Sequence, residues 1–278
     1  MPTELVSIAT PTTPLEGAFH PARSASRGSV QLFHGNTMNF YVGAPRFLPP
    51  VLTTDGWDCL AYNRRGHDVL SNRDSRRLEG GAYQTIAEAL EDDALARQWL
   101  TARTGHVPVA IGHSNGGLLA ATQVATQPET PALVLLSAHR GGVGVMRLMA
   151  DNGLMAADRY DEMTAEARAL VADGAGDELM LAPGWWNVIS ARTYVEFLDH
   201  CPDLLDAAPA ITCPVLYIVG DEEPEDLYPV AAFDEACPGP VDTFRIAGCG
   251  HYYTGCEDAV AHKVREWLGD TLRDRENK

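Results

Sequence analysis

The chain has 278 residues, 45% of them hydrophobic, and carries a formal net charge of −17 at pH 7. This length and apolar content are enough to bury one large core, so we expect a single domain with room for an insertion. The excess of acidic residues argues against nucleic-acid and anionic-membrane partners, because both are bound through clustered Lys and Arg.

Signals for export, membrane insertion and metal binding are absent from the sequence. Residues 1–17 lack the basic region and apolar core of a secretory signal. No apolar run approaches the roughly 18 residues needed to span a bilayer. The six cysteines form no C-x-x-C pair and no zinc-like spacing with histidine. We therefore expect a soluble, cytoplasmic protein with reduced cysteines, a small-molecule substrate, and no metal or cofactor.

Segments with strand character alternate with segments of helical character along most of the chain. Residues 4–9 and 14–20 indicate an opening pair of strands, 29–36 a buried strand, and 57–68 a strand that runs into a basic turn. Further strands are predicted at 107–112, 132–137, 214–220 and 241–247, and helices at 81–103, 116–127, 228–237 and 257–273. Such alternation is typical of a parallel sheet covered on both faces by helices, so we predict an α/β fold.

Residues 141–206 interrupt this alternation. They read as helices with Gly and Pro breaks and carry no strand pattern. Because the segment falls between two sheet strands, we expect it to cover the carboxyl ends of the strands as a lid. Trp185 and Trp186 within it are candidates for lining an apolar substrate pocket, although they fit equally well as packing between lid and sheet.

The stretch 107–127, VPVAIGHSNGGLLAATQVATQ, runs from a strand through a hinge of small residues into a helix. A nucleophilic serine needs such a hinge, because its hydroxyl must project from a tight strand-to-helix turn. Side chains two positions away would collide with the neighbouring strand and helix, and glycine removes that collision. Gly112, Ser114 and Gly116 satisfy this G-x-S-x-G pattern. We therefore predict Ser114 as the nucleophile, with the backbone N–H of Asn115 as one oxyanion donor.

A base for Ser114 is expected after the last strand. His251 lies there, in a glycine-rich loop between that strand and the final helix. The chain order, with the serine first and the histidine last, predicts His251 as the general base. His113 adjoins Ser114 in sequence but is expected to point elsewhere. The remaining histidines considered are interpreted as surface or packing residues: His67, His106, His139, His200 and His262.

An acid that orients the histidine is expected at the end of the strand CPVLYIVG. The stretch that follows, GDEEPEDLYP, offers several carboxylates. The common register places the acid three residues after the glycine and before a proline, which selects Glu223. Asp221 and Asp226 stay open as alternatives. Either type of acid can hold the histidine in its working tautomer.

A second oxyanion donor is expected from the loop that follows strand 29–36. This strand ends in LFHGN, where Gly35 gives the backbone the freedom to bend inward. The backbone N–H of Asn36 is therefore the predicted donor.

Taken in chain order, the motifs HGN, GHSNGG, GDEE and GCGHYY resemble those of the α/β-hydrolase-fold serine hydrolases over residues 4–273. The stretch YNRRGHDVLS resembles a further turn of that family, D-x-R-G-H-G-x-S, from which Asn63 and Asp68 depart. The resemblance implies that the predicted serine, histidine and acid form a catalytic triad. It also implies hydrolysis of an acyl-type bond, but no particular substrate.

The resemblance further implies an α/β-hydrolase core at residues 1–140 and 207–278 and a helical lid at 141–206. A serine nucleophile excludes the members that use aspartate, the haloalkane dehalogenases and epoxide hydrolases. We expect hydrolysis of a carboxylic ester or lactone of a small, partly apolar substrate through an acyl-enzyme on Ser114. A C–C bond of a diketone-type substrate, an amide, and a catalytically silent ligand-binding role stay open as alternatives. Neither the substrate nor the oligomeric state follows from the sequence.

Overall fold

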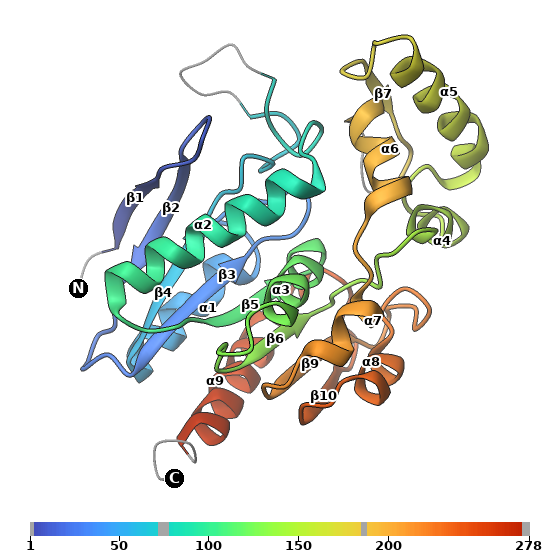
Figure 1. Ribbon diagram of the computed structural model, residues 1–278. Helices are drawn as coiled ribbons and strands as arrows, with labels where there is room; N and C mark the ends of the chain where they lie inside the picture. The colour runs from blue at the N-terminus through green and yellow to red at the C-terminus, as the bar shows by residue number, and fades with distance from the viewer. Residues whose placement is uncertain (1–2, 72–77, 185–187, 274–278) are drawn as a thin grey trace.

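The structure, a computed structural model, describes residues 3–71, 78–184 and 188–273. Its central sheet contains β1 (Glu4–Ile8), β2 (Leu15–His20), β3 (Gly28–Phe33), β4 (Trp57–Tyr62), β5 (Val109–His113), β6 (Leu133–Leu136), β9 (Val215–Gly220) and β10 (Val241–Ile246). The strand order is β1-β2-β4-β3-β5-β6-β9-β10 (Figure 1). The pairs β1–β2 and β2–β4 are antiparallel, and the other neighbours in this sheet are parallel. This confirms the predicted α/β fold with a mostly parallel sheet.

Helices cover both faces of the sheet. On one face lie α1 (Ala44–Leu52) and α9 (Glu257–Arg273); on the other lie α2 (Ile86–Thr104), α3 (Asn115–Ala125) and α8 (Val230–Ala236). Alternate residues of β6 serve the two faces, because successive strand side chains point in opposite directions. Leu133 and Leu135 pack in the cluster that contains α3, and Val134 and Leu136 in the cluster that contains α9. No helix in the described part of the chain is long and apolar enough to cross a membrane.

The ends of α2 follow from its local sequence. The side chain of Thr85 accepts a hydrogen bond from the backbone of Glu88, whose carboxylate accepts one from the backbone of Thr85. Because of this reciprocal cap the helix begins at Ile86, several residues later than the periodicity of 81–103 predicts. At the other end Gly105 takes a left-handed conformation with φ of 74°, which glycine adopts without steric cost.

Helix α1 is not predicted by the sequence, because its segment APRFLPPVL contains three prolines. Pro45 stands in the first turn, where its missing N–H costs no helical hydrogen bond. The apolar side chains of Leu48 and Leu52 are fully buried against the sheet, so packing holds this short helix in place.

The chain between β6 and β9 contains a further set of elements. They are α4 (Val145–Asp151), α5 (Tyr160–Ala172), β7 (Leu179–Leu181), β8 (Val188–Ser190), α6 (Ala191–His200) and α7 (Leu204–Ala207). Figure 1 shows α4, α5 and α6 set apart from the eight-stranded sheet. The antiparallel pair β7–β8 corrects the expectation that residues 141–206 contain no strand. Strands of three residues are too short for the alternation that identifies a strand in sequence. That this segment acts as a lid stays a prediction.

Three short 3-10 helices complete the secondary structure of the described residues. They are η1 (Thr53–Asp55), η2 (Ala157–Arg159) and η3 (Ala208–Ala210).

Candidate active site

Ser114 stands in the sharp turn between β5 and α3. Its φ of 57° and ψ of −126° are a backbone conformation that residues other than glycine seldom adopt. A Cβ atom on Gly112 would lie 2.2 Å from the carbonyl oxygen of Gly116, and one on Gly116 would lie 2.4 Å from that of His34. Neither contact is sterically possible. The two glycines therefore permit the turn that holds the Ser114 hydroxyl at the carboxyl edge of the sheet.

The structure brings Ser114 together with His251 and Glu223. Nε2 of His251 lies 3.0 Å from Oγ of Ser114, and its Nδ1 lies 2.8 Å from Oε1 of Glu223. A carboxylate only accepts hydrogen bonds, so Nδ1 carries the hydrogen. Nε2 is then free of hydrogen and accepts the hydroxyl proton of Ser114. This is the tautomer in which a histidine can act as a base toward serine.

Buried donors fix the second oxygen of the Glu223 carboxylate. Oε2 accepts a 2.5 Å hydrogen bond from the Ser137 hydroxyl and a 2.8 Å hydrogen bond from the backbone N–H of Gly220. The side chain is 3% exposed, so both oxygens are held without help from bulk water.

The two alternative acids lie elsewhere. Oδ1 of Asp221 accepts a hydrogen bond of 3.3 Å from the backbone N–H of Cys249. Oδ2 of Asp226 accepts one of 3.4 Å from the amide of Asn152, on the exposed surface. Of the three carboxylates considered, Glu223 is the one that the structure places on His251.

The two predicted oxyanion donors border one cavity with Ser114. Asn36 and Asn115 both line it. The backbone N–H of Asn115 belongs to the first turn of α3, where N–H groups have no partner within the helix. The loop that carries Asn36 passes close to the serine, since a Cβ atom on Gly35 would lie 3.2 Å from Cβ of Ser114. Thr37, the next residue in this loop, has a positive φ of 54°.

The turn after β4 supports the loop that carries Asn36. The guanidinium of Arg64 donates a 2.6 Å hydrogen bond to the carbonyl of His34 and pairs with Asp93, and all three side chains are buried. Burial raises the pKa of Asp93 to about 6, against the opposing effect of Arg64. Asn63, which departs from the family turn, accepts a hydrogen bond of 2.8 Å from the backbone N–H of Phe40.

The cavity above Ser114 is small and partly lined by methionine. Its volume is about 30 Å³, and Met38, Met149 and Met155 are among its lining residues. A larger groove of about 730 Å³ shares four residues with it: Asn36, Thr37, Met38 and Tyr252. The predicted pocket residues Trp185 and Trp186 lie outside the described residues.

Two histidines without a predicted catalytic role lie at the site, His113 and the expected surface or packing residue His139. The ring of His113 donates a 2.8 Å hydrogen bond from Nε2 to the carbonyl of His251. His139 lines the cavity; its Nδ1 accepts the N–H of Gly141, so its Nε2 donates to the side-chain oxygen of Asn115 at 3.3 Å. Burial, and secondarily the nearby His251, lowers the pKa of each to about 3.

A signal for His139 was present in the sequence. It follows the strand predicted at 132–137, and residues just beyond the carboxyl ends of parallel strands converge on the ligand crevice. The side-chain direction of His113 carries no such signal, because it depends on packing against the distant loop of His251.

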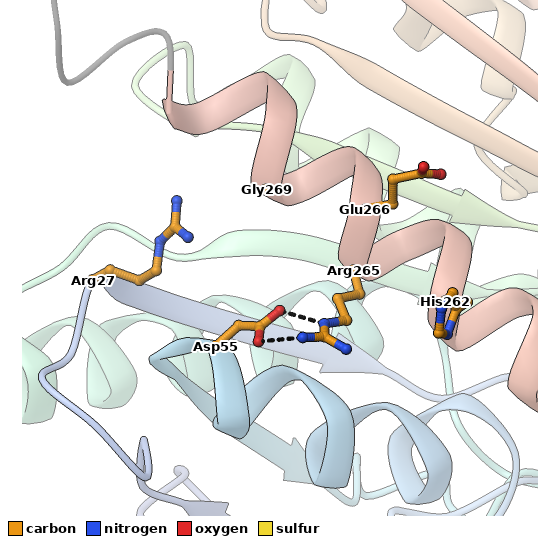
Figure 2. A pocket seen from close by; sticks show the side chains of 6 residues that line it. All are labelled: Arg27, Asp55, His262, Arg265, Glu266 and Gly269. Carbon is orange, nitrogen blue, oxygen red and sulfur yellow. Dashed lines mark hydrogen bonds and ion pairs between the residues drawn. The ribbon is translucent and has the colours of Figure 1, made fainter.

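Another hollow, of about 490 Å³, shares no lining residue with the Ser114 cavity. Figure 2 shows the side chains that line it. Asp55 and Arg265 form a bidentate ion pair there, with N–O distances of 2.6 and 2.9 Å. Its lining residues include no serine, threonine or cysteine, so it does not repeat the chemistry of the Ser114 site. Within the described residues, no group of three or more His, Cys, Asp or Glu side chains is arranged to hold a metal ion.

The sequence matches a family model described as the alpha/beta hydrolase family over residues 32–263. No curated protein sequence matches the chain.

Solved structures resemble the fold over nearly the whole chain. Est1E from Butyrivibrio proteoclasticus shares 17% identity at a TM-score of 0.68, over 97% of this chain and 99% of Est1E. A carboxyl esterase from Bacillus coagulans shares 16% identity at a TM-score of 0.73, over 98% and 99%. A dienelactone hydrolase from Anabaena variabilis shares 20% identity at a TM-score of 0.60, over 97% of both chains. At such identities the likeness shows the fold alone.

Proposed function

The chain belongs to the alpha/beta hydrolase family, and we propose that it is a serine hydrolase that cleaves a carboxylic ester or lactone of a small, partly apolar substrate. The observation that carries the proposal is the hydrogen-bonded series from Ser114 through His251 to Glu223, with contacts of 3.0 and 2.8 Å. A series of this kind turns a weakly nucleophilic hydroxyl into one that attacks a carbonyl carbon.

The proposed reaction begins when Oγ of Ser114 attacks the substrate carbonyl and His251 takes the hydroxyl proton on Nε2. The backbone N–H groups of Asn36 and Asn115 stabilise the negative oxygen of the tetrahedral intermediate. His251 then returns the proton to the leaving alkoxide, and the acyl group stays on Ser114. Water, deprotonated by the same nitrogen, attacks the acyl-enzyme. His251 then gives this proton to Oγ of Ser114 as it leaves, and the acid is released. Glu223 holds the imidazole and stabilises its positive charge.

The cavity supports a substrate with a short acyl group. A volume of about 30 Å³ with methionine side chains in its wall suits a small apolar group near Ser114. The adjoining groove of about 730 Å³ leaves room for the rest of the molecule. The structure of Est1E with ferulic acid bound, 18% identical at a TM-score of 0.71 over 96% of this chain and 99% of Est1E, supports a small organic molecule as the substrate.

A panel of p-nitrophenyl esters and simple lactones, combined with a fluorophosphonate probe, tests the proposal. We expect the wild type to hydrolyse the short-chain members and to be labelled stoichiometrically, and Ser114→Ala to be inactive and unlabelled. Ser29→Ala is the matched control, because this buried serine of β3 hydrogen-bonds the carbonyl of His106 at 3.2 Å, away from the cavity. Labelling that survives Ser114→Ala would overturn the assignment of the nucleophile. If the wild type is labelled but turns over only amides or diketones, the cleaved bond is not that of an ester or lactone.

A further inference from the structure

The hydroxyl of Tyr228 contacts the nitrogen of His251 that also contacts Glu223. It lies 3.1 Å from Nδ1, and the two rings are tilted by 40° with centroids 5.5 Å apart. Tyr228 is 2% exposed. Burial, and secondarily Glu223, raises its pKa far above neutrality, so the hydroxyl stays protonated. A buried, uncharged phenol therefore lies against the imidazole of the proposed base.

Whether the Tyr228 hydroxyl donates or accepts this hydrogen bond depends on whether Nδ1 carries a hydrogen. Nδ1 already contacts Oε1 of Glu223 at 2.8 Å, and that oxygen requires Nδ1 to carry the hydrogen. A ring nitrogen that carries a hydrogen has no lone pair left to accept a second one. The Tyr228 oxygen therefore does not donate to Nδ1 but accepts from it. The Nδ1–H group of His251 is shared between the carboxylate and the phenol.

One short turn supplies both acceptors. The carbonyl of Pro224 accepts hydrogen bonds from the N–H groups of Leu227 and Tyr228, at 3.2 and 3.0 Å. Glu223 directly precedes this turn, and Tyr228 ends it. The relative positions of the carboxylate and the phenol are thus fixed by local backbone contacts, independently of the loop that carries His251.

We propose that Tyr228 is a positioning residue, whose oxygen is the second acceptor for Nδ1–H of His251 and holds the imidazole in the orientation that serves Ser114. The inference rests on the proposed function. During attack by Ser114 the imidazole becomes positively charged, and the partly negative phenol oxygen stabilises that charge. The contact is therefore stronger in the transition state than in the resting protein, and its loss should lower kcat more than it raises KM.

Tyr228→Phe removes the hydroxyl and keeps the ring. One net hydrogen bond corresponds to about a threefold to tenfold effect, so we expect fluorophosphonate labelling and kcat to fall by about that factor with KM nearly unchanged. The Nδ1 proton of His251, which we expect far downfield in the proton NMR spectrum, should also change its chemical shift.

Tyr217→Phe is the matched control. Its hydroxyl is equally buried but donates to the carbonyl of Ala138 at 2.5 Å, away from His251. This variant should lose stability and keep the labelling rate, kcat and the proton shift of the wild type. A wild-type labelling rate and proton shift in Tyr228→Phe would overturn the inference, and so would equal effects in the two variants.

Glu223→Ala provides a second test. With the carboxylate removed, Tyr228 supplies the acceptor for Nδ1–H, so adding Tyr228→Phe should slow labelling by a larger factor than it does in the wild type. An equal or smaller factor contradicts the shared hydrogen bond. A wild type that the probe fails to label would instead overturn the proposed function itself, which keeps the two failures distinct.

Discussion

Ser137 and Glu223 are 86 positions apart in the chain, yet the hydroxyl of Ser137 donates a 2.5 Å hydrogen bond to Oε2 of Glu223. The hydroxyl of Tyr253 lies 2.6 Å from the same serine oxygen. The end of β6, the turn after β9 and the loop after β10 therefore meet at one carboxylate. Ser137 has a positive φ of 46°, which is costly for a serine and marks a backbone held in place by its surroundings.

Substitution by amides should distinguish Glu223 from its neighbours. Glu223→Gln keeps the shape of the side chain but presents a neutral amide to Nδ1 of His251. The tautomer that carries its hydrogen on Nδ1 is then no longer strongly favoured. The loss of turnover can approach about 10⁴-fold. Asp221→Asn and Asp226→Asn, measured as kcat at neutral pH, should stay near the wild type. The reverse result, with Glu223→Gln active and one Asp variant inactive, would assign the acid to that aspartate.

Removal of the imidazole of His251 should nearly abolish ester turnover. Loss of the base from a serine, histidine and acid series lowers kcat by about 10³-fold or more. His251→Ala should nevertheless keep the far-ultraviolet circular dichroism of the wild type, because the side chain lies in a loop. His262→Ala, on the exposed side of α9, is the control and should retain activity. More than about a tenth of wild-type activity in His251→Ala would point to another base.

Shortening Met149 should shift the preference for acyl length. Met149 is buried in α4 and lines the cavity above Ser114, so Met149→Ala enlarges the space near the acyl carbon. We expect relative kcat/KM to rise for longer p-nitrophenyl esters, along with a loss of stability of about 2–5 kcal/mol. Met163→Ala is the control, since Met163 is equally buried in α5 but does not line the cavity. The same chain-length profile in both variants would show that Met149 only fills space.

His139 should contribute to acid sensitivity. Burial lowers its pKa from 6.5 to about 3, so between these values the unfolded chain binds a proton that the folded chain does not. The contribution of this neutral histidine to stability is therefore present above pH 6.5 and is lost as the pH falls toward 3. The slope is up to about 1.4 kcal/mol per pH unit. His139→Gln should remove it, which urea unfolding at several pH values between these limits will measure; parallel curves for both proteins would contradict the prediction.

Ser114 and Glu223 could be predicted from local chain geometry, and His251 from its place in the loop after the last strand. The strand-to-helix turn requires glycine at 112 and 116, and the contacts of 2.2 and 2.4 Å that a Cβ would make there explain why. Glu223 follows from its register after Gly220, whose N–H does bond its carboxylate at 2.8 Å.

The contacts of Ser137, Tyr228 and His113 could not be predicted in the same way. Each depends on which distant loop packs against the residue, as in the bond from His113 to the carbonyl of His251, 138 positions away. Helix α1 and the β7–β8 hairpin were missed for local reasons. The prolines of α1 hide its helical pattern in the sequence, and β7 and β8 have only three residues each.

The strand order also has a consequence for how activity is acquired during folding. β9 joins the sheet beside β6, although the whole segment from α4 to α7 separates them in the chain, and β10 then pairs with β9. Pairings between residues so distant in sequence form slowly, because the intervening chain must be closed into a loop first. Ser114 is placed by β5 and α3, whereas Glu223 and His251 reach their positions beside it only after β9 and β10 have paired. A refolding chain should thus regain its helical signal before it regains any power to react with an ester.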